Sequence, residues 1–243
     1  MAALTAEAVL RLADAGPRLP GPERALLAIA AAEPERPWEE LRALTVGECD
    51  RRLVLLHEEM FGAELEGFAE CPRCGEAVEV RIAAAELLEE TGSPQEKEPA
   101  TARGEGLTVT FRLPTAGDLA DVAARAADVE SARAAILDLC VLEVSGGARP
   151  SELPQPLVDE VARRMAERDP AAEVELALAC PACDHRWTVV LDAGTFLWRK
   201  LDALAGRLAE EVDALARAYG WSEREILALP SARRSRYLEL VGG

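Results

Sequence analysis

Two short stretches, Cys71-Pro72-Arg73-Cys74-Gly75 and Cys180-Pro181-Ala182-Cys183-Asp184, contain the two Cys-x-x-Cys motifs of this chain. Two cysteines at this spacing share one turn, so both sulfur atoms can point at one centre. A structural zinc ion takes four ligands in a tetrahedron, and one motif therefore supplies half of a site. The sequence predicts a single zinc site that joins distant parts of the chain through four ligands, Cys71, Cys74, Cys180 and Cys183.

The segments that flank the two motifs follow the same pattern. The apolar residues Val78, Val80 and Ile82 alternate with polar ones, which is typical of a half-buried strand. The β-branched and aromatic residues of segment 187–191 predict a matching strand after the second motif. We interpret the two regions as β-hairpins with a zinc knuckle in each turn. The predicted fold class is α+β, mostly helical, with the two hairpins forming a split zinc ribbon.

Three other uses of the cysteines are open. A redox Cys-x-x-Cys pair normally begins a helix, whose N-terminus lowers the thiol pKa, whereas a glycine and a strand-like run follow the first motif here. Disulfides would require an oxidising compartment. Two separate zinc sites would need further ligands, for which the chain offers Cys49, Cys140, His57 and His185. We expect both of these cysteines to be core residues, because they lie in apolar helical runs.

The composition excludes several classes of function. The chain has 243 residues and a formal net charge of −17, so it repels nucleic-acid backbones. It has no apolar run near the ~20 residues of a membrane span, and its start does not resemble a signal peptide. It also lacks a glycine-rich phosphate loop and a nucleophile motif. We therefore expect a cytoplasmic, non-enzymatic protein with no nucleic-acid, membrane or small-molecule partner.

Prolines, glycines and changes in periodicity predict five segments. Proline interrupts the amphipathic helices near the start, and residues 91–105 are polar, without periodicity. The segments are an amphipathic N-terminal arm (1–43), a helix with the first knuckle (44–90), a flexible linker (91–105), a helical insertion with one strand (106–172), and the second knuckle with the C-terminal helices (173–243).

Three features of the helices are informative. The sequences that begin at Thr45 and Ser222 each place a glutamate three residues later, which predicts a capping box at a helix start. Near the C-terminus, three arginines form a basic cluster on an acidic chain. We predict that this cluster, formed by Arg233, Arg234 and Arg236, binds a partner protein.

Three stretches carry a resemblance to a known family. They are Leu44-Thr45-Val46-Gly47-Glu48-Cys49-Asp50-Arg51 running into Phe61-Gly62, Phe111-Arg112-Leu113-Pro114-Thr115 with Asp118-Leu119, and Tyr219-Gly220-Trp221-Ser222-Glu223-Arg224-Glu225-Ile226-Leu227 through Arg236-Tyr237-Leu238. Together with the knuckles, they resemble the family of T-even phage baseplate hub assembly proteins. Relatives of that family are encoded in contractile tails and phage-tail-like injection systems. The resemblance spans about residues 40–241 and is most specific in the second knuckle and the C-terminal stretch.

The resemblance implies a non-enzymatic structural or assembly role, including that of an assembly chaperone, in a contractile injection machine. The implied partners are other baseplate or hub proteins, and the protein would be made in the cytoplasm and could join a phage tail or injection particle. The chain departs from the family pattern at two positions. Cys49 stands where an arginine is expected, and Asp184 stands where a glycine is expected. Aspartate tolerates the left-handed conformation that such a glycine would take.

Overall fold

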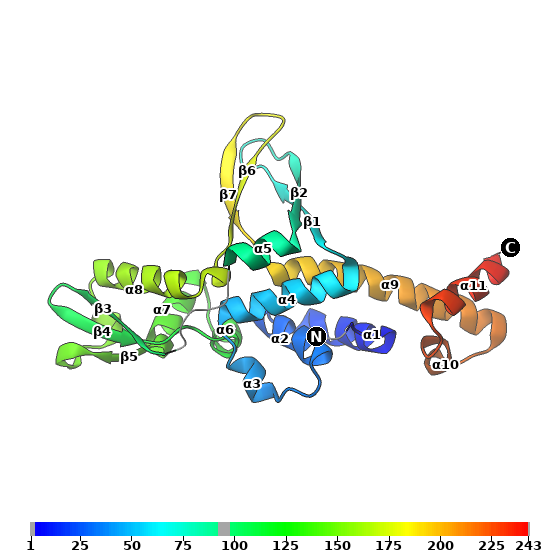
Figure 1. The fold of residues 1–243 in the computed structure, drawn as a ribbon, viewed down its shortest axis with the longest axis horizontal. Coiled ribbons are helices and arrows are strands. Elements are labelled where there is room, and N and C mark those ends of the chain that lie inside the picture. Colours follow the sequence, from blue (N-terminus) through cyan, green and yellow to red (C-terminus); the bar gives the residue numbers. More distant parts are fainter. Residues whose placement is uncertain (1–2, 92–97, 243) are drawn as a thin grey trace.

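The computed structural model describes residues 3–91 and 98–242, and it shows an α+β protein that is mostly helical (Figure 1). None of the helices within these residues is long and apolar enough to cross a membrane. The helices are α1 (Ala6–Ala15), α2 (Gly21–Ala32), α3 (Trp38–Arg42), α4 (Val46–Phe61), α5 (Ala84–Thr91), α6 (Ala116–Ala123), α7 (Val129–Cys140), α8 (Gln155–Arg168), α9 (Ala193–Tyr219), α10 (Glu223–Leu227) and α11 (Ser231–Gly242).

The strands of the described residues form three small antiparallel sheets. Two sheets are hairpins, β1 (Glu64–Glu70) with β2 (Ala77–Ala83) and β6 (Glu175–Ala179) with β7 (Arg186–Val190). The third sheet has the order β3–β4–β5, formed by Ala100–Gly104, Leu107–Phe111 and Val141–Val144. The hairpins project together from the helical body, next to α5 (Figure 1).

The main hydrophobic core lies where α1, α2, α4 and α9 meet. Leu26, Ile29, Leu56, Leu197 and Leu201 have no exposed surface in this core. Each such side chain stabilises the fold by roughly 1.5–3 kcal/mol through burial. The segment predicted as an N-terminal arm, residues 1–43, thus contributes two of the helices that form the core, because its apolar faces are buried against α4 and α9.

The predicted capping boxes are present. The Thr45 hydroxyl accepts a hydrogen bond from the backbone N–H of Glu48 at 3.2 Å, and the Glu48 carboxylate accepts one from the N–H of Thr45 at 3.0 Å. Ser222 and Glu225 make the same pair of bonds at the start of α10. These bonds satisfy backbone donors that have no partner within the helix, which fixes where each helix begins.

A second, smaller hydrophobic core, distinct from the main one, lies on the three-stranded sheet. Ala102, Val109, Phe111, Leu157 and Val161 are buried between the sheet and α8. The prediction that residues 91–105 form a flexible linker is wrong for the last part of this segment, because Ala100–Gly104 forms strand β3 and pairs with β4. Residues 92–97 of that segment lie outside the described residues.

The predicted insertion, residues 106–172, contains two strands instead of one. The run that follows α7 leaves the helix at Val141 and forms β5, which pairs with β4 through a shift of register at Thr110 and Phe111. Strands β3 and β5 are hard to recognise in the sequence because few of their side chains are buried. Ala102 and Val144 do reach the second core, but the other side chains of the two strands are half-buried or exposed, so pairing with β4 is needed to place these strands.

Candidate metal centre

The first knuckle, residues 71–76, is the turn of the β1–β2 hairpin. The backbone N–H of Cys71 donates to the carbonyl of Glu76 at 2.8 Å, and the N–H of Gly75 donates to the carbonyl of Cys71 at 2.9 Å. Gly75 has a φ of 75°, in the left-handed region that glycine takes without steric cost. This turn reverses the chain while keeping the sulfur atoms of Cys71 and Cys74 on the same side.

The second knuckle, residues 180–185, repeats these contacts in the turn of the β6–β7 hairpin. The N–H of Cys180 donates to the carbonyl of His185 at 2.9 Å, and the N–H of Asp184 donates to the carbonyl of Cys180 at 3.0 Å. Asp184 has a φ of 55° and takes the position that Gly75 takes in the first knuckle. The expectation that aspartate would adopt the left-handed conformation at this position is therefore confirmed.

The four cysteines of the two knuckles meet in one cluster. The Sγ atoms of Cys71 and Cys183 are 3.7 Å apart, those of Cys74 and Cys180 are 3.6 Å apart, and all four lie within 4.8 Å of one another. Four sulfurs at about 2.3 Å from a zinc ion would be about 3.8 Å apart at the edges of a tetrahedron. The cysteines are unbonded to each other. Their spacing fits a four-thiolate metal site.

The electrostatics of the cluster also suit a cation. Burial disfavours the charged form of Cys71, but backbone N–H groups of Arg73 and Cys74 and the neighbouring thiols lower the pKa of Cys71 to about 7. Although a hydrogen bond from the backbone of Glu76 lowers the pKa of Cys74, the neighbouring thiols and burial raise it to about 12. The Cys71 thiol thus ionises readily, whereas the Cys74 thiol stays protonated, because a second negative charge would lie beside the first. A metal cation would remove that repulsion.

The side chains of the other candidate ligands are not part of the cysteine cluster. Cys49 is buried in α4 and Cys140 at the end of α7, and burial raises the pKa of both thiols, that of Cys140 to about 11. His57 is buried beside Phe61, with ring centroids 5.5 Å apart, and burial lowers its pKa. His185 stacks on Trp187. These positions agree with the interpretation of both cysteines as core residues.

The predicted basic cluster divides into two kinds of position. Arg233 and Arg236 are exposed on α11. Arg234 is only 6% exposed, and its Nε donates to the Glu211 carboxylate at 2.9 Å while its Nη1 donates to the carbonyl of Leu229. Arg234 therefore joins α11 to α9. Of the three arginines in the cluster, only Arg233 and Arg236 are exposed at the surface.

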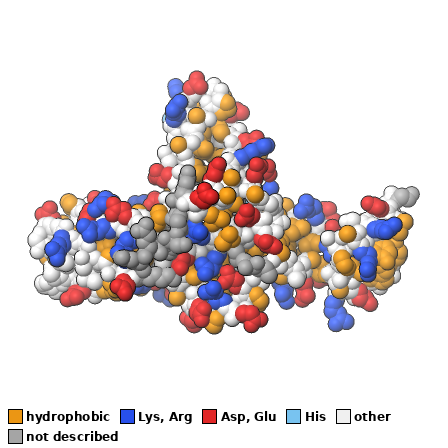
Figure 2. Space-filling view, in the orientation of Figure 1, with side chains coloured by type: hydrophobic (Ala, Val, Ile, Leu, Met, Phe, Trp, Pro, Cys, Tyr) orange, Lys and Arg blue, Asp and Glu red, His pale blue; other side chains and the backbone are white. Residues whose placement is uncertain are grey.

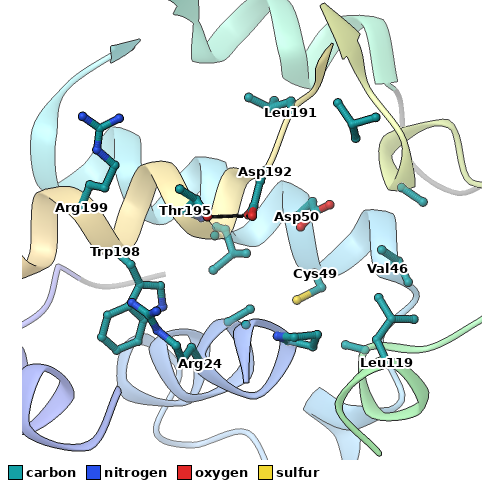
Figure 3. A pocket seen from close by; sticks show the side chains of 18 of the residues that line it. Arg24, Val46, Cys49, Asp50, Leu119, Leu191, Asp192, Thr195, Trp198 and Arg199 are labelled. Atoms are coloured by element: carbon teal, nitrogen blue, oxygen red, sulfur yellow. Dashed lines mark hydrogen bonds between the residues drawn. The ribbon is translucent and has the colours of Figure 1, made fainter. Parts of the chain in front are cut away.

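A pocket of about 530 Å³ lies between α2, α4, α6 and the start of α9, where the sequence pattern gave no signal (Figure 3). Arg24 stacks over the Trp198 ring at 4.5 Å on one side of this pocket. Asp50 and Asp192 line the other side, and Asp192 accepts hydrogen bonds from Thr195. Burial and the carboxylates of Asp192 and Asp169 raise the pKa of Asp50 to about 7. The pocket is lined by none of the four clustered cysteines.

Comparisons of this chain with protein-family models, with curated proteins and with solved structures found no match.

Proposed function

We propose that Cys71, Cys74, Cys180 and Cys183 hold one structural zinc ion, and that the two hairpins form a split zinc ribbon around it. The observation that carries this proposal is the approach of the four sulfur atoms to within 4.8 Å. Four thiolates fill the coordination sphere of zinc and leave no open position for water or substrate. The ion would therefore stabilise the arrangement of the hairpins and take no part in catalysis.

We further propose that the protein has a non-enzymatic structural or assembly role in the baseplate or hub of a contractile phage tail or phage-tail-like injection system. The support for this proposal is the family resemblance of the three stretches quoted above. Residues in each stretch make local structural contacts. Thr45 and Ser222 begin capping boxes, and Arg112 pairs with Asp118 at 2.6 Å. These contacts are structural and make no reactive centre.

One observation favours the alternative of a thiol redox protein. The pKa of Cys71 is lowered to about 7, which would make its thiolate available at neutral pH. However, both motifs lie in hairpin turns instead of at a helix N-terminus, and each pair of cysteines faces the other pair. Four converging sulfurs suit a metal better than a two-cysteine exchange reaction, so zinc binding is the function that the geometry favours.

Deletion of the coding sequence from its native genome tests the baseplate proposal. We expect the deletion strain to produce few or no complete injection particles by electron microscopy, and expression of the wild-type chain in trans to restore them. Mass spectrometry of purified wild-type particles then separates a resident component from an assembly factor. Normal numbers of complete particles in the deletion strain would contradict the proposal.

A further inference from the structure

The C-terminal tip, which we define as residues 219–242, has an aromatic cluster on its surface. Tyr219 stacks on Trp221 with ring centroids 4.6 Å apart, and Tyr237 meets the Trp221 ring edge-on at 5.0 Å. The chain has only two tyrosines and four tryptophans, and both tyrosines are in this cluster. Tyr219 remains 39% exposed. Aromatic side chains at protein surfaces are concentrated at binding interfaces, where they supply large contact areas with few rotatable bonds.

The tip lies at the far end of α9, away from the helical body (Figure 1). The buried ion pair of Arg234 with Glu211 fixes α11 against α9, and Ile226 of α10 is completely buried there. Gly220 ends α9 with a φ of 69°, which turns the chain sharply into α10. A surface that is fixed before binding loses little conformational entropy when a partner docks.

One face of α11 carries both basic and apolar side chains and borders the solvent. Arg233, Tyr237 and Leu240 follow each other at intervals of four and three residues, and Arg236 lies beside them, so that all four share one side of the helix. Leu240 is 70% exposed, and both arginines are exposed. Figure 2 shows hydrophobic and basic side chains gathered at this end of the molecule.

The charge of the tip differs from that of the rest of the protein. Residues 219–242 contain four arginines and three glutamates, whereas the chain as a whole has a net charge of −17. Glu225 is engaged in the capping box with Ser222, and its pKa is lowered by those hydrogen bonds. Four arginines against three glutamates leave the tip with a net charge of +1, so the exposed Arg233 and Arg236 would attract an acidic partner that the acidic remainder of the protein repels.

We propose that the C-terminal tip is a docking surface for an acidic, amphipathic helix of another protein of the injection machine. The partner's apolar residues pack on Tyr237 and Leu240, and its carboxylates pair with Arg233 and Arg236. A helix laid along an exposed apolar stripe is a common mode of recognition, and opposite charges at the rim set its orientation. This inference rests on the proposed baseplate function, because that function supplies the partner.

The test uses the full tagged chain, co-expressed in turn with each baseplate and hub protein of the same machine. We expect at least one of them to be retained. Its dissociation constant should rise by about tenfold or more in the double variant Arg233→Glu, Arg236→Glu, because attraction at the rim becomes repulsion. The variant Leu240→Ser, which changes an exposed apolar side chain of the same face, should also weaken retention. A matched control is Arg125→Glu, Arg133→Glu, which makes the same charge change at two exposed arginines outside the tip. The control should bind like the wild type.

Several results would overturn the inference. Tip variants that bind as tightly as the control, retention of no baseplate or hub protein by the wild type, or cross-links from the tip to a basic partner segment would each do so. Self-association in the ultracentrifuge that the tip variants abolish would assign the surface to a second copy of this chain. Unchanged metal content and unchanged melting of the variants exclude misfolding. If deletion stops particle assembly but the tip variants restore it fully, the baseplate function stands and the docking surface fails.

Discussion

At the scale of single residues, Asp184 departs from the turn chemistry of the first knuckle, where glycine has the left-handed conformation. A non-glycine residue pays about 1–2 kcal/mol there, and a β-branched residue is disfavoured most. We expect Asp184→Gly to retain or slightly raise the free energy of unfolding, and Asp184→Val to lower it by about 1–2 kcal/mol. Denaturant unfolding in the presence of zinc measures both changes. Thr188→Val, at an exposed position in the neighbouring strand β7, is the control. Equal effects of the glycine and valine variants would contradict this account of the turn.

At the scale of elements, a pair of charged groups joins the end of β4 to the start of α6. Arg112 donates to both carboxylate oxygens of Asp118 at 2.6 and 3.0 Å, and Asp118 also accepts from the backbone N–H of Thr115. Burial raises the pKa of Asp118, but the hydrogen bonds from Arg112 and Thr115 outweigh it and leave the pKa below its usual value. We expect Asp118→Asn to lower the free energy of unfolding at pH 7 by about 1.5–3 kcal/mol.

The same pair predicts a dependence on pH. Because the pKa of Asp118 is lower in the folded state, its contribution is fully present above the unfolded-state pKa of about 3.9 and is lost as pH falls through the folded-state value. The difference between wild type and Asp118→Asn should therefore shrink in acid, as urea unfolding at several pH values would measure. Asp138→Asn, at an exposed position on α7, should show a small difference at every pH. A difference for Asp118→Asn that stays constant down to pH 2 would refute the role of the ion pair.

At the scale of the whole molecule, the cysteine cluster ties together two hairpins that are far apart in the sequence, while the helical core lies elsewhere. Metal binding at this cluster would add to the folding free energy, since the four sulfur atoms converge only in the folded chain. We expect one zinc ion per chain by elemental analysis. Cys180→Ser should lower the melting temperature strongly and retain most of the helical circular dichroism at low temperature. A chelator should lower the melting temperature of the wild type and leave that of the variant unchanged. Two zinc ions per chain, none, or a variant that melts like the wild type would disprove the shared site.

Much of the local structure was determined by the sequence itself. Thr45 and Ser222 begin helices where their capping boxes predict, and Gly62 and Gly220 follow the last residues of α4 and α9. These signals act within one turn of the chain, so neighbouring residues contain the whole cause. The meeting of the four cysteines could be predicted for a related reason, because a Cys-x-x-Cys pair offers only two of the four ligands that a tetrahedral metal site takes, and the chain has one other such pair.

Tertiary structure alone decided the features that depend on contacts between distant residues. Ala100–Gly104 is a strand because β4 offers it a partner, and the small side chains of Ala100 and Ala102 give only a weak apolar alternation that would reveal it. Arg234 is buried because Glu211 on α9 meets it, although it stands between two exposed arginines in the sequence. Tyr219, Trp221 and Tyr237 become one cluster only when α11 folds back on α9. Glu211 belongs to α9 and Arg234 to α11, and Trp221 stands before α10 whereas Tyr237 belongs to α11, so no pattern within a single element reports either contact. Sequence patterns report which face of an element is apolar, whereas the packing of one element on another determines what that face, and each charge beside it, will meet.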